Sequence, residues 1–275
     1  WRGQAGSIAP AALIVTSRHR LWQRFGADGV ARIENAVAAL PSAMAMRGLS
    51  GTLVHADDSP LLGYLGLLPV RPDSAESVAT LVRAVCERLR WTDEVGRFVL
   101  ILGDDGIVPF HRLANPSVDG DEAVLSDHPY GVDGTDPLHP VRAVGRIPGP
   151  GLDALVRGIE AAASAHRRLA AGKSLPLADD AFGLSASIWK RPARAVFAAV
   201  GDPRALRLSP PLSTDDRPVP GSAGPRFRYF NLHGLSDACE WFGQRHPSFP
   251  ADYEAFPVAL RASDLTEAPG SVIVS

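Results

Sequence analysis

The sequence has little cysteine and no excess of either charge. Cys86 and Cys239 are the only cysteines, and so few thiols favour a reducing compartment such as the cytoplasm. The formal net charge is −2, which provides no global field to attract nucleic acid or an anionic membrane. No apolar run approaches the length that crosses a bilayer, and the first residues show no signal-peptide pattern. We therefore expect no nucleic-acid and no membrane partner.

The motifs of several common enzyme classes are also missing. There is no P-loop and no G-x-G-x-x-G, and the turn at 103–106 (GDDG) only superficially resembles a nucleotide-binding loop. The G-x-S-x-G elbow of serine hydrolases is present only in part, at 183–185 (GLS). A zinc site with the usual ligand spacing is not formed by the best candidate set, His233, Asp237, Cys239 and His246. We predict neither a metal nor a cofactor.

What the first half does contain is an alternation of buried strands and amphipathic helices. We expect strands at 11–16, 51–56 and 98–102, with helices at 21–40 and from an Asp73 cap onward. Strand–helix–strand repeats favour a mostly parallel twisted sheet with right-handed crossovers and helices on both faces. The fold class predicted for the chain is therefore α/β, in three layers.

The second half is less regular. Many turn-forming dipeptides at 111–150 predict a long irregular segment, which in a compact domain is usually functional or flexible. Beyond it we expect helices at 152–172, 190–200 and 251–265, and strands at 182–189, 206–208, 226–232 and 271–275. No clear linker separates two halves, so residues 1–275 are expected to form a single domain.

The stretch on which the functional interpretation depends most is 226–234 (RFRYFNLHG). Its β-favouring residues stop at His233-Gly234, so the imidazole is expected at the carboxyl end of a strand, where α/β sheets carry their chemistry. Another buried strand is expected at 271–275. Two neighbouring parallel strands, one of which ends in His, suggest a two-residue site whose second residue is not in this sequence.

Four motifs in this order resemble gingipain-like (C25-type) cysteine peptidases of the caspase-like superfamily. They are FVLILGDDGIVP at 98–109, SDHPYG at 126–131, VGRIP at 144–148 and LHG at 232–234. The resemblance covers about residues 10 to 275. It implies a caspase-like three-layer fold and a cysteine endopeptidase that cleaves proteins or peptides with a Cys–His dyad.

Within this resemblance, His233 matches the dyad histidine and the backbone N–H of Gly234 matches one oxyanion donor. The dyad cysteine should follow the strand at 271–275, and in caspases the His lies about fifty residues upstream of the Cys, which puts the nucleophile just past Ser275. Cys239 is the only thiol near His233 in sequence, and we expect it to pack rather than react. The chain begins at Trp1 without a Met and is expected to be a large-subunit-like piece of a longer protein.

Substrate preference would come from loops after the early strands. The candidates are Arg18 and Arg20 in a basic loop at 17–20, the Asp104-Asp105 turn, Asp127, and Trp189-Lys190. Arginines in the pocket would favour an acidic substrate residue, whereas Asp104 or Asp127 would favour a basic one.

The resemblance also implies partners within the same protein. A small subunit or further domains would complete the active site, and the substrate would be a protein or peptide. The alternative is a non-catalytic caspase-like module that scaffolds a partner. A Cys within a few residues after Ser275 would favour the enzyme, and its absence would favour the scaffold.

Overall fold

The computed structural model describes residues 12–90, 97–115, 122–134, 136, 139–172, 181–213, 227–235, 238–264 and 272–274. The chain divides into two compact units, Trp1–Gly172 and Lys173–Ser275, and each is described by itself. The expectation that residues 1–275 form a single domain stays a prediction. In the described part of the chain, no helix combines the length and apolar character needed to cross a membrane.

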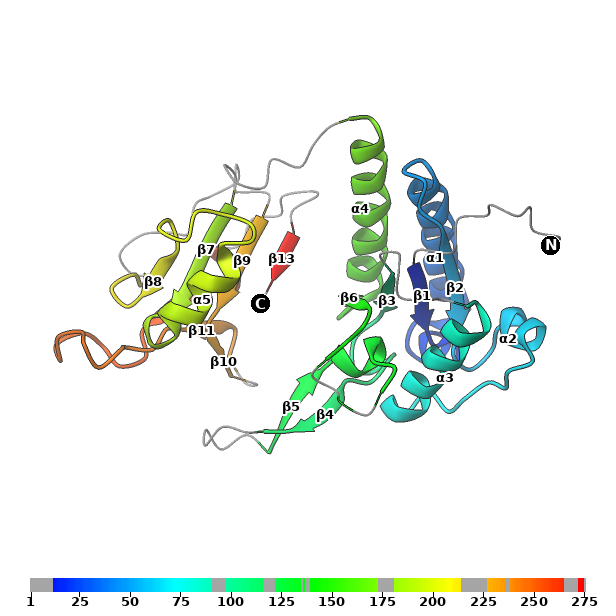
Figure 1. The fold of residues 1–275 in the computed structure, drawn as a ribbon, viewed down its shortest axis with the longest axis horizontal. Coiled ribbons are helices and arrows are strands. Elements are labelled where there is room, and N and C mark those ends of the chain that lie inside the picture. The colour runs from blue at the N-terminus through cyan, green and yellow to red at the C-terminus, as the bar shows by residue number, and fades with distance from the viewer. Residues whose placement is uncertain are drawn as a thin grey trace. The chain divides into compact units, whose positions relative to one another are not determined.

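Unit 1 contains a four-stranded parallel sheet in the order β2-β1-β3-β6 (Figure 1). Its strands are β1 (Ala12–Thr16), β2 (Gly51–His55), β3 (Phe98–Leu102) and β6 (Ala143–Ile147). Successive side chains of a strand point to opposite faces, and all five residues of β1 are buried, so both faces of the sheet are covered. The three strands expected in the first half are confirmed.

The helices of unit 1 are α1 (Arg18–Ala45), α2 (Pro60–Leu65), α3 (Ala75–Arg88) and α4 (Leu152–Ala170). The chain moves from β1 outward to β2 and then back across β1 to β3, so right-handed crossovers put α1 and α3 on opposite faces of the sheet. Helix α4 packs along α1, as Figure 1 shows, which makes a layer of two helices on one face. The three-layer α/β arrangement predicted from the alternation is therefore present.

Two helix starts differ from the sequence expectation. The basic segment at 17–20 is not a loop, because Ser17 caps α1 by accepting a hydrogen bond from the Arg20 N–H, and Arg18 begins the helix. Helix α3 is capped by Ser74, whose hydroxyl accepts from the Ser77 N–H at 3.1 Å, rather than by Asp73. Asp73 instead accepts a hydrogen bond from Arg71. In both places a serine hydroxyl is better placed to reach the free N–H groups of the first turn.

The segment 111–150, expected to be irregular, contains regular structure. Strands β4 (His111–Ala114) and β5 (Ala123–Ser126) form an antiparallel pair, and a 3₁₀ turn, η1 (His128–Gly131), follows. Strand β6 then adds to the sheet edge beside β3. Strand β6 was not predicted from the sequence, because its five residues, AVGRI, include a glycine and an arginine. These residues form a strand because they pair with β3.

Unit 2 contains a second parallel sheet in the order β13-β9-β7-β8. Its strands are β7 (Ala181–Ala186), β8 (Arg207–Ser209), β9 (Phe227–Asn231) and β13 (Val272–Val274). The expected adjacency of the strands at 226–232 and 271–275 is confirmed, because β13 pairs in parallel with β9 and Val274 lies opposite Tyr229. The strand expected at 182–189 ends early, in the 3₁₀ turn η2 (Ser187–Trp189), and α5 (Lys190–Phe197) follows.

A small antiparallel sheet completes unit 2. It consists of β10 (His233–Gly234), β11 (Glu240–Phe242) and β12 (Val258–Arg261), with a 3₁₀ turn, η3 (Ala262–Asp264), at its end. The helix predicted at 251–265 is wrong. Pro257 disfavours helical backbone at the residue before it, and the next residues satisfy their backbone groups by pairing with β11.

The turn after β3 depends on a glycine. Gly103 has φ +109°, a region that residues with a side chain rarely adopt, and a Cβ there would lie 2.5 Å from the Cβ of buried Ile107. Gly48 also has a positive φ, +70°, but nothing lies within 4 Å of a Cβ added to it. Comparing substitutions at these two glycines therefore separates the cost of backbone strain from the cost of steric overlap.

We predict that Gly103→Ala lowers the free energy of unfolding by roughly 2–5 kcal/mol, since strain and overpacking add at this site. Gly48→Ala should cost only about 1 kcal/mol, because it introduces strain alone. Urea unfolding followed by circular dichroism measures both. Equal losses in the two variants would contradict the role assigned to Ile107.

Candidate active site

His233 lies where the chain passes from one sheet of unit 2 to the other. Strand β9 ends at Asn231, and His233 opens β10 two residues later. Strand β10 pairs with β11, with His233 opposite Phe242 and Gly234 opposite Trp241. The imidazole therefore stands just past the carboxyl end of a parallel strand, as the sequence predicts, on backbone held by a second sheet.

The His233 ring is half-buried and contacted on several sides. The Trp189 ring lies 4.4 Å from it between centroids at 43°, and the Phe256 ring lies 5.8 Å away, edge-on at 71°. Nε2 of His233 is 2.9 Å from Oε1 of Gln244. Contacts of this kind restrict ring rotation, so the imidazole is held in one orientation.

The contact with Gln244 also selects a tautomer. An amide oxygen can only accept a hydrogen bond, so Nε2 of His233 carries the hydrogen and donates it. The other ring nitrogen, Nδ1, then has a free lone pair and can take up a proton. This is the arrangement of a general base oriented by a second residue.

Gln244 was missed by the sequence reasoning. It lies eleven residues after His233, in the segment that follows β11, and no motif marks it. The antiparallel return of the chain through β11 brings it back to the imidazole. The only available signal was the short apolar run Trp241-Phe242 after a turn, which is typical of a hairpin.

Among the predicted substrate contacts, Trp189 belongs to unit 2, and its ring lies 4.4 Å from that of His233. Gly234, the predicted oxyanion donor, is exposed, and a Cβ added to it would meet only the Trp241 ring, 3.7 Å away at its nearest atom. Lys190 begins α5 and is exposed. The oxyanion role of Gly234 and the substrate role of Trp189 stay predictions.

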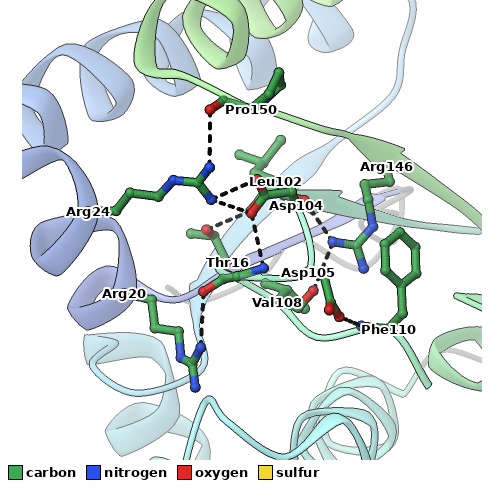
Figure 2. Close-up of polar contacts among 12 residues, drawn as sticks. Thr16, Arg20, Arg24, Leu102, Asp104, Asp105, Val108, Phe110, Arg146 and Pro150 are labelled. Atoms are coloured by element: carbon green, nitrogen blue, oxygen red, sulfur yellow. Dashed lines mark hydrogen bonds and ion pairs between the residues drawn. The ribbon is translucent and has the colours of Figure 1, made fainter. Parts of the chain in front are cut away.

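Arg18, Asp104 and Asp127 belong to unit 1, and each is engaged in ion pairs there. Arg18 pairs with Glu34 at 3.2 Å and with Asp58 at 3.3 Å. Asp104 accepts hydrogen bonds from Arg24 at 2.6 and 2.7 Å and from the Gly106 N–H at 3.0 Å (Figure 2). The substrate roles of Arg18, Asp104 and Asp127 stay predictions.

The Asp127 pair is the most buried of these. Its carboxylate accepts from Nε and Nη2 of Arg146 at 2.8 and 2.6 Å, and the two side chains are only 18% and 8% exposed. The same guanidinium donates to the carbonyl oxygens of Gly103 and Val108 at 2.7 and 2.8 Å, and it lies 4.1 Å from the centre of the Phe110 ring (Figure 2).

These contacts hold the segment 103–110 at the carboxyl end of β3. Arg20 donates to the Gly106 carbonyl at 3.1 Å, and Arg24 links Asp104 to the Pro150 carbonyl at 3.1 Å (Figure 2). Asp105 accepts from the Phe110 N–H at 2.7 Å and from Arg112 at 2.9 Å. The acidic turn that sequence reasoning proposed for substrate therefore also serves as an anchor for its own loop.

In the described part of unit 2, Cys239 is the one cysteine, and no metal cluster accompanies His233. Cys239 is exposed and free, whereas Cys86 of unit 1 is free and buried on α3. Among the residues described, no three His, Cys, Asp or Glu side chains gather as a metal site would need. Asp237, one member of the weighed zinc set, lies outside the described residues.

No protein-family model matches the chain, and no curated protein matches it. Among solved structures it is similar to a protease, with 10% identity over 85% of this chain and 47% of that chain and a TM-score of 0.51. It is also similar to gingipain R, an Arg-specific cysteine proteinase, with 13% identity over 82% and 48% and a TM-score of 0.49. A complex of Porphyromonas gingivalis RgpB pro- and mature domains matches at 13% identity over 82% and 48%, with a TM-score of 0.46.

At these identities the likeness concerns the fold. The match to the first of these structures agrees with the parallel sheets and flanking helices described above, and the predicted α/β fold is confirmed. The chain spans about half the length of the structures that it matches.

We predict that Asp127→Asn lowers the free energy of unfolding by roughly 3 kcal/mol, because it leaves the buried Arg146 charge without its carboxylate. Asp153→Asn is the matched control, since the pair between Asp153 and Arg32 is mostly exposed and should contribute less than about 1 kcal/mol. Chemical denaturation of both variants measures the difference. An Asp127→Asn protein as stable as the control would show that the Arg146 contacts do not hold the loop.

Proposed function

We propose that this chain is the histidine-bearing part of a cysteine endopeptidase in which His233 is the general base. The observation that carries the proposal is an oriented imidazole at the end of β9 with a parallel strand, β13, directly beside β9. Residues that follow a parallel strand emerge at the same edge of the sheet as the residues that follow its neighbour. A side chain just after β13 would therefore belong to the same edge as His233.

The register between β9 and β13 narrows the range of positions that we propose for the nucleophilic cysteine. Val274 lies opposite Tyr229, and His233 is four residues after Tyr229. If the register continued, the fourth residue after Val274 would be level with His233. We propose that the dyad cysteine of the longer protein lies within a few residues of that position.

The proposed chemistry needs only these two groups and backbone donors. Nδ1 of His233 takes the proton of the thiol, and the thiolate attacks the carbonyl carbon of the scissile peptide bond. The protonated imidazole then gives this proton to the leaving amine as the C–N bond breaks. Water hydrolyses the resulting thioester, again with His233 as base. The Gly234 N–H is proposed as one donor to the transient oxyanion.

The surroundings of His233 support a protein or peptide substrate. Phe256, which touches the imidazole edge-on, is 51% exposed, and Leu235 beside Gly234 is also exposed. Apolar side chains at the rim of a site can pack against side chains of a bound peptide. We therefore keep Trp189 as a proposed substrate contact and add Phe256.

Other parts of the same protein are the proposed partners. The chain spans about half the length of the similar protease structure. We propose that a further segment of this protein supplies the cysteine and the rest of the substrate pocket.

We predict that His233→Ala in the full-length protein lowers kcat/KM for peptide cleavage at least about 100-fold, because the general base is lost. His246→Ala is the matched control and should leave cleavage unchanged, since the His246 side chain hydrogen-bonds with Ser248. A peptide library with mass-spectrometric detection measures both variants. A folded His233→Ala protein that still cleaves would refute the proposed base, and a full-length protein that cleaves nothing would favour the scaffold.

We predict that iodoacetamide at pH 7.5 labels a cysteine after β13 before it labels Cys86 or Cys239 in the full-length protein. Burial raises the pKa of the Cys86 thiol to about 11, so very little Cys86 thiolate exists at that pH. Cys239 is exposed and should react at an ordinary rate. Peptide mass spectrometry over time ranks the three sites, and fastest labelling of Cys239 would overturn the assignment.

A further inference from the structure

The small antiparallel sheet of unit 2 has one face on a hydrophobic core and carries His233 on the other. Trp241 lies directly opposite Gly234 and packs against the buried cluster that contains Phe182 and Phe230. Successive residues of a strand belong to opposite faces, so His233 is on the face away from this cluster. The imidazole therefore lies on the outer face of the sheet.

Large apolar side chains accompany His233, and two of them are exposed. Phe256 touches the imidazole edge-on with ring centroids 5.8 Å apart and is 51% exposed. Leu235 directly follows β10 and is 57% exposed. The Trp189 ring lies on the imidazole at 4.4 Å. Exposed apolar side chains that gather beside a candidate catalytic group mark a surface that a partner or substrate covers.

The contacts of the imidazole contribute no charge to this surface. Trp189, Phe256 and Gln244 are all uncharged. Glu240 of β11 and Arg261 of β12 lie directly opposite each other in the same sheet. Opposite charges in such a cross-strand position compensate each other. The immediate surroundings of His233 therefore suit an apolar side chain better than a charged one.

The direction of proton transfer decides which substrate residue meets this surface. A general acid must come within hydrogen-bond reach of the atom that it protonates, which here is the nitrogen of the leaving amine. The α-carbon of the residue after the scissile bond is bonded to that nitrogen. The side chain of this residue is therefore brought among the side chains that surround the imidazole.

We propose that the substrate residue directly after the scissile bond is large and apolar, such as leucine or phenylalanine. Its side chain packs against Leu235 and Phe256, with Trp189 beside the imidazole. This inference rests on the proposed peptidase function and names a residue preference of the same site. The preference is set by the histidine-bearing part of the protein, whereas the segment that supplies the cysteine contacts other substrate positions.

The test measures kcat/KM of the full-length protein for peptides that differ only in the residue after the scissile bond. The quantity kcat/KM includes the step in which the amine leaves, so it reports contacts with this residue. Peptides with leucine or phenylalanine there should be cleaved about tenfold faster, or more, than those with arginine, aspartate or glycine, because only the large apolar side chains gain from burial. Mass spectrometry identifies the bond that is cut.

Variants at the surface distinguish direct contact from a general effect on the enzyme. Leu235→Ser and Phe256→Ser should each lower the ratio of kcat/KM for the leucine peptide over the glycine peptide several-fold. Leu235→Asp should raise kcat/KM for the arginine peptide relative to the leucine peptide. Val196→Ser is the matched control, since Val196 is an apolar residue of α5 with 55% exposure, and it should leave both ratios unchanged. Each ratio compares two peptides in one variant, so a loss of folded protein or a disturbed base cancels.

Three results would overturn this inference and leave the peptidase proposal intact. They are faster cleavage before a charged residue than before leucine, equal rates for the leucine and glycine peptides, and unchanged ratios in both Leu235→Ser and Phe256→Ser. A full-length protein that cleaves no peptide would instead refute the peptidase proposal and this inference with it. The two failures are therefore distinguished by whether any peptide is cut.

Discussion

Hydrogen bonding between parallel strands determines where the candidate functional side chains of this protein can lie. In a parallel sheet all carboxyl ends meet at one edge, and in each unit the residues that follow the strands are gathered there. In unit 1 this edge carries Asp57 after β2 and Asp104 after β3. In unit 2 it carries His233 after β9, and the neighbouring strand β13 runs parallel to β9 toward the same edge.

The carboxylates that lie together at this edge need cations or hydrogen-bond donors as partners. Asp57 accepts hydrogen bonds from Ser17 and from the Arg18 and His19 N–H groups, so one carboxylate satisfies the start of α1. Asp104 is paired with Arg24, and Asp127 with Arg146. The Arg146 pair is nearly buried, and a buried charge that lost its partner would be costly, whereas the exposed pairs of Arg18 contribute little. Loop geometry in unit 1 therefore depends mainly on Arg146.

The environment of His233 differs from that of the charged residues in unit 1. Its partners are an amide and two aromatic rings rather than carboxylates. An amide acceptor selects the tautomer and places no charge beside the ring. Aromatic packing restricts the ring while leaving one nitrogen available. This arrangement of the imidazole requires both the parallel and the antiparallel sheet of unit 2.

Local sequence was sufficient to predict many of the strands and helices. Short β-favouring runs predicted β1, β2 and β3, helical periodicity predicted α1, α3 and α4, and another β-favouring run predicted the strand that leads to His233. These features depend on neighbours a few residues apart, so composition and spacing reveal them. The adjacency of β9 and β13 followed from the same patterns together with the family resemblance.

Only the tertiary structure decided the rest. Strand β6 exists because β3 pairs with it, β12 is a strand because β11 pairs with it, and both were missed or assigned wrongly from sequence. The partners Gln244 for His233 and Arg146 for Asp127 come from segments brought together by folding, and no local pattern marks them. Whether a charged side chain faces a ligand or anchors its own loop depends on such long-range contacts, because the free energy of a charge is set by what surrounds it in space.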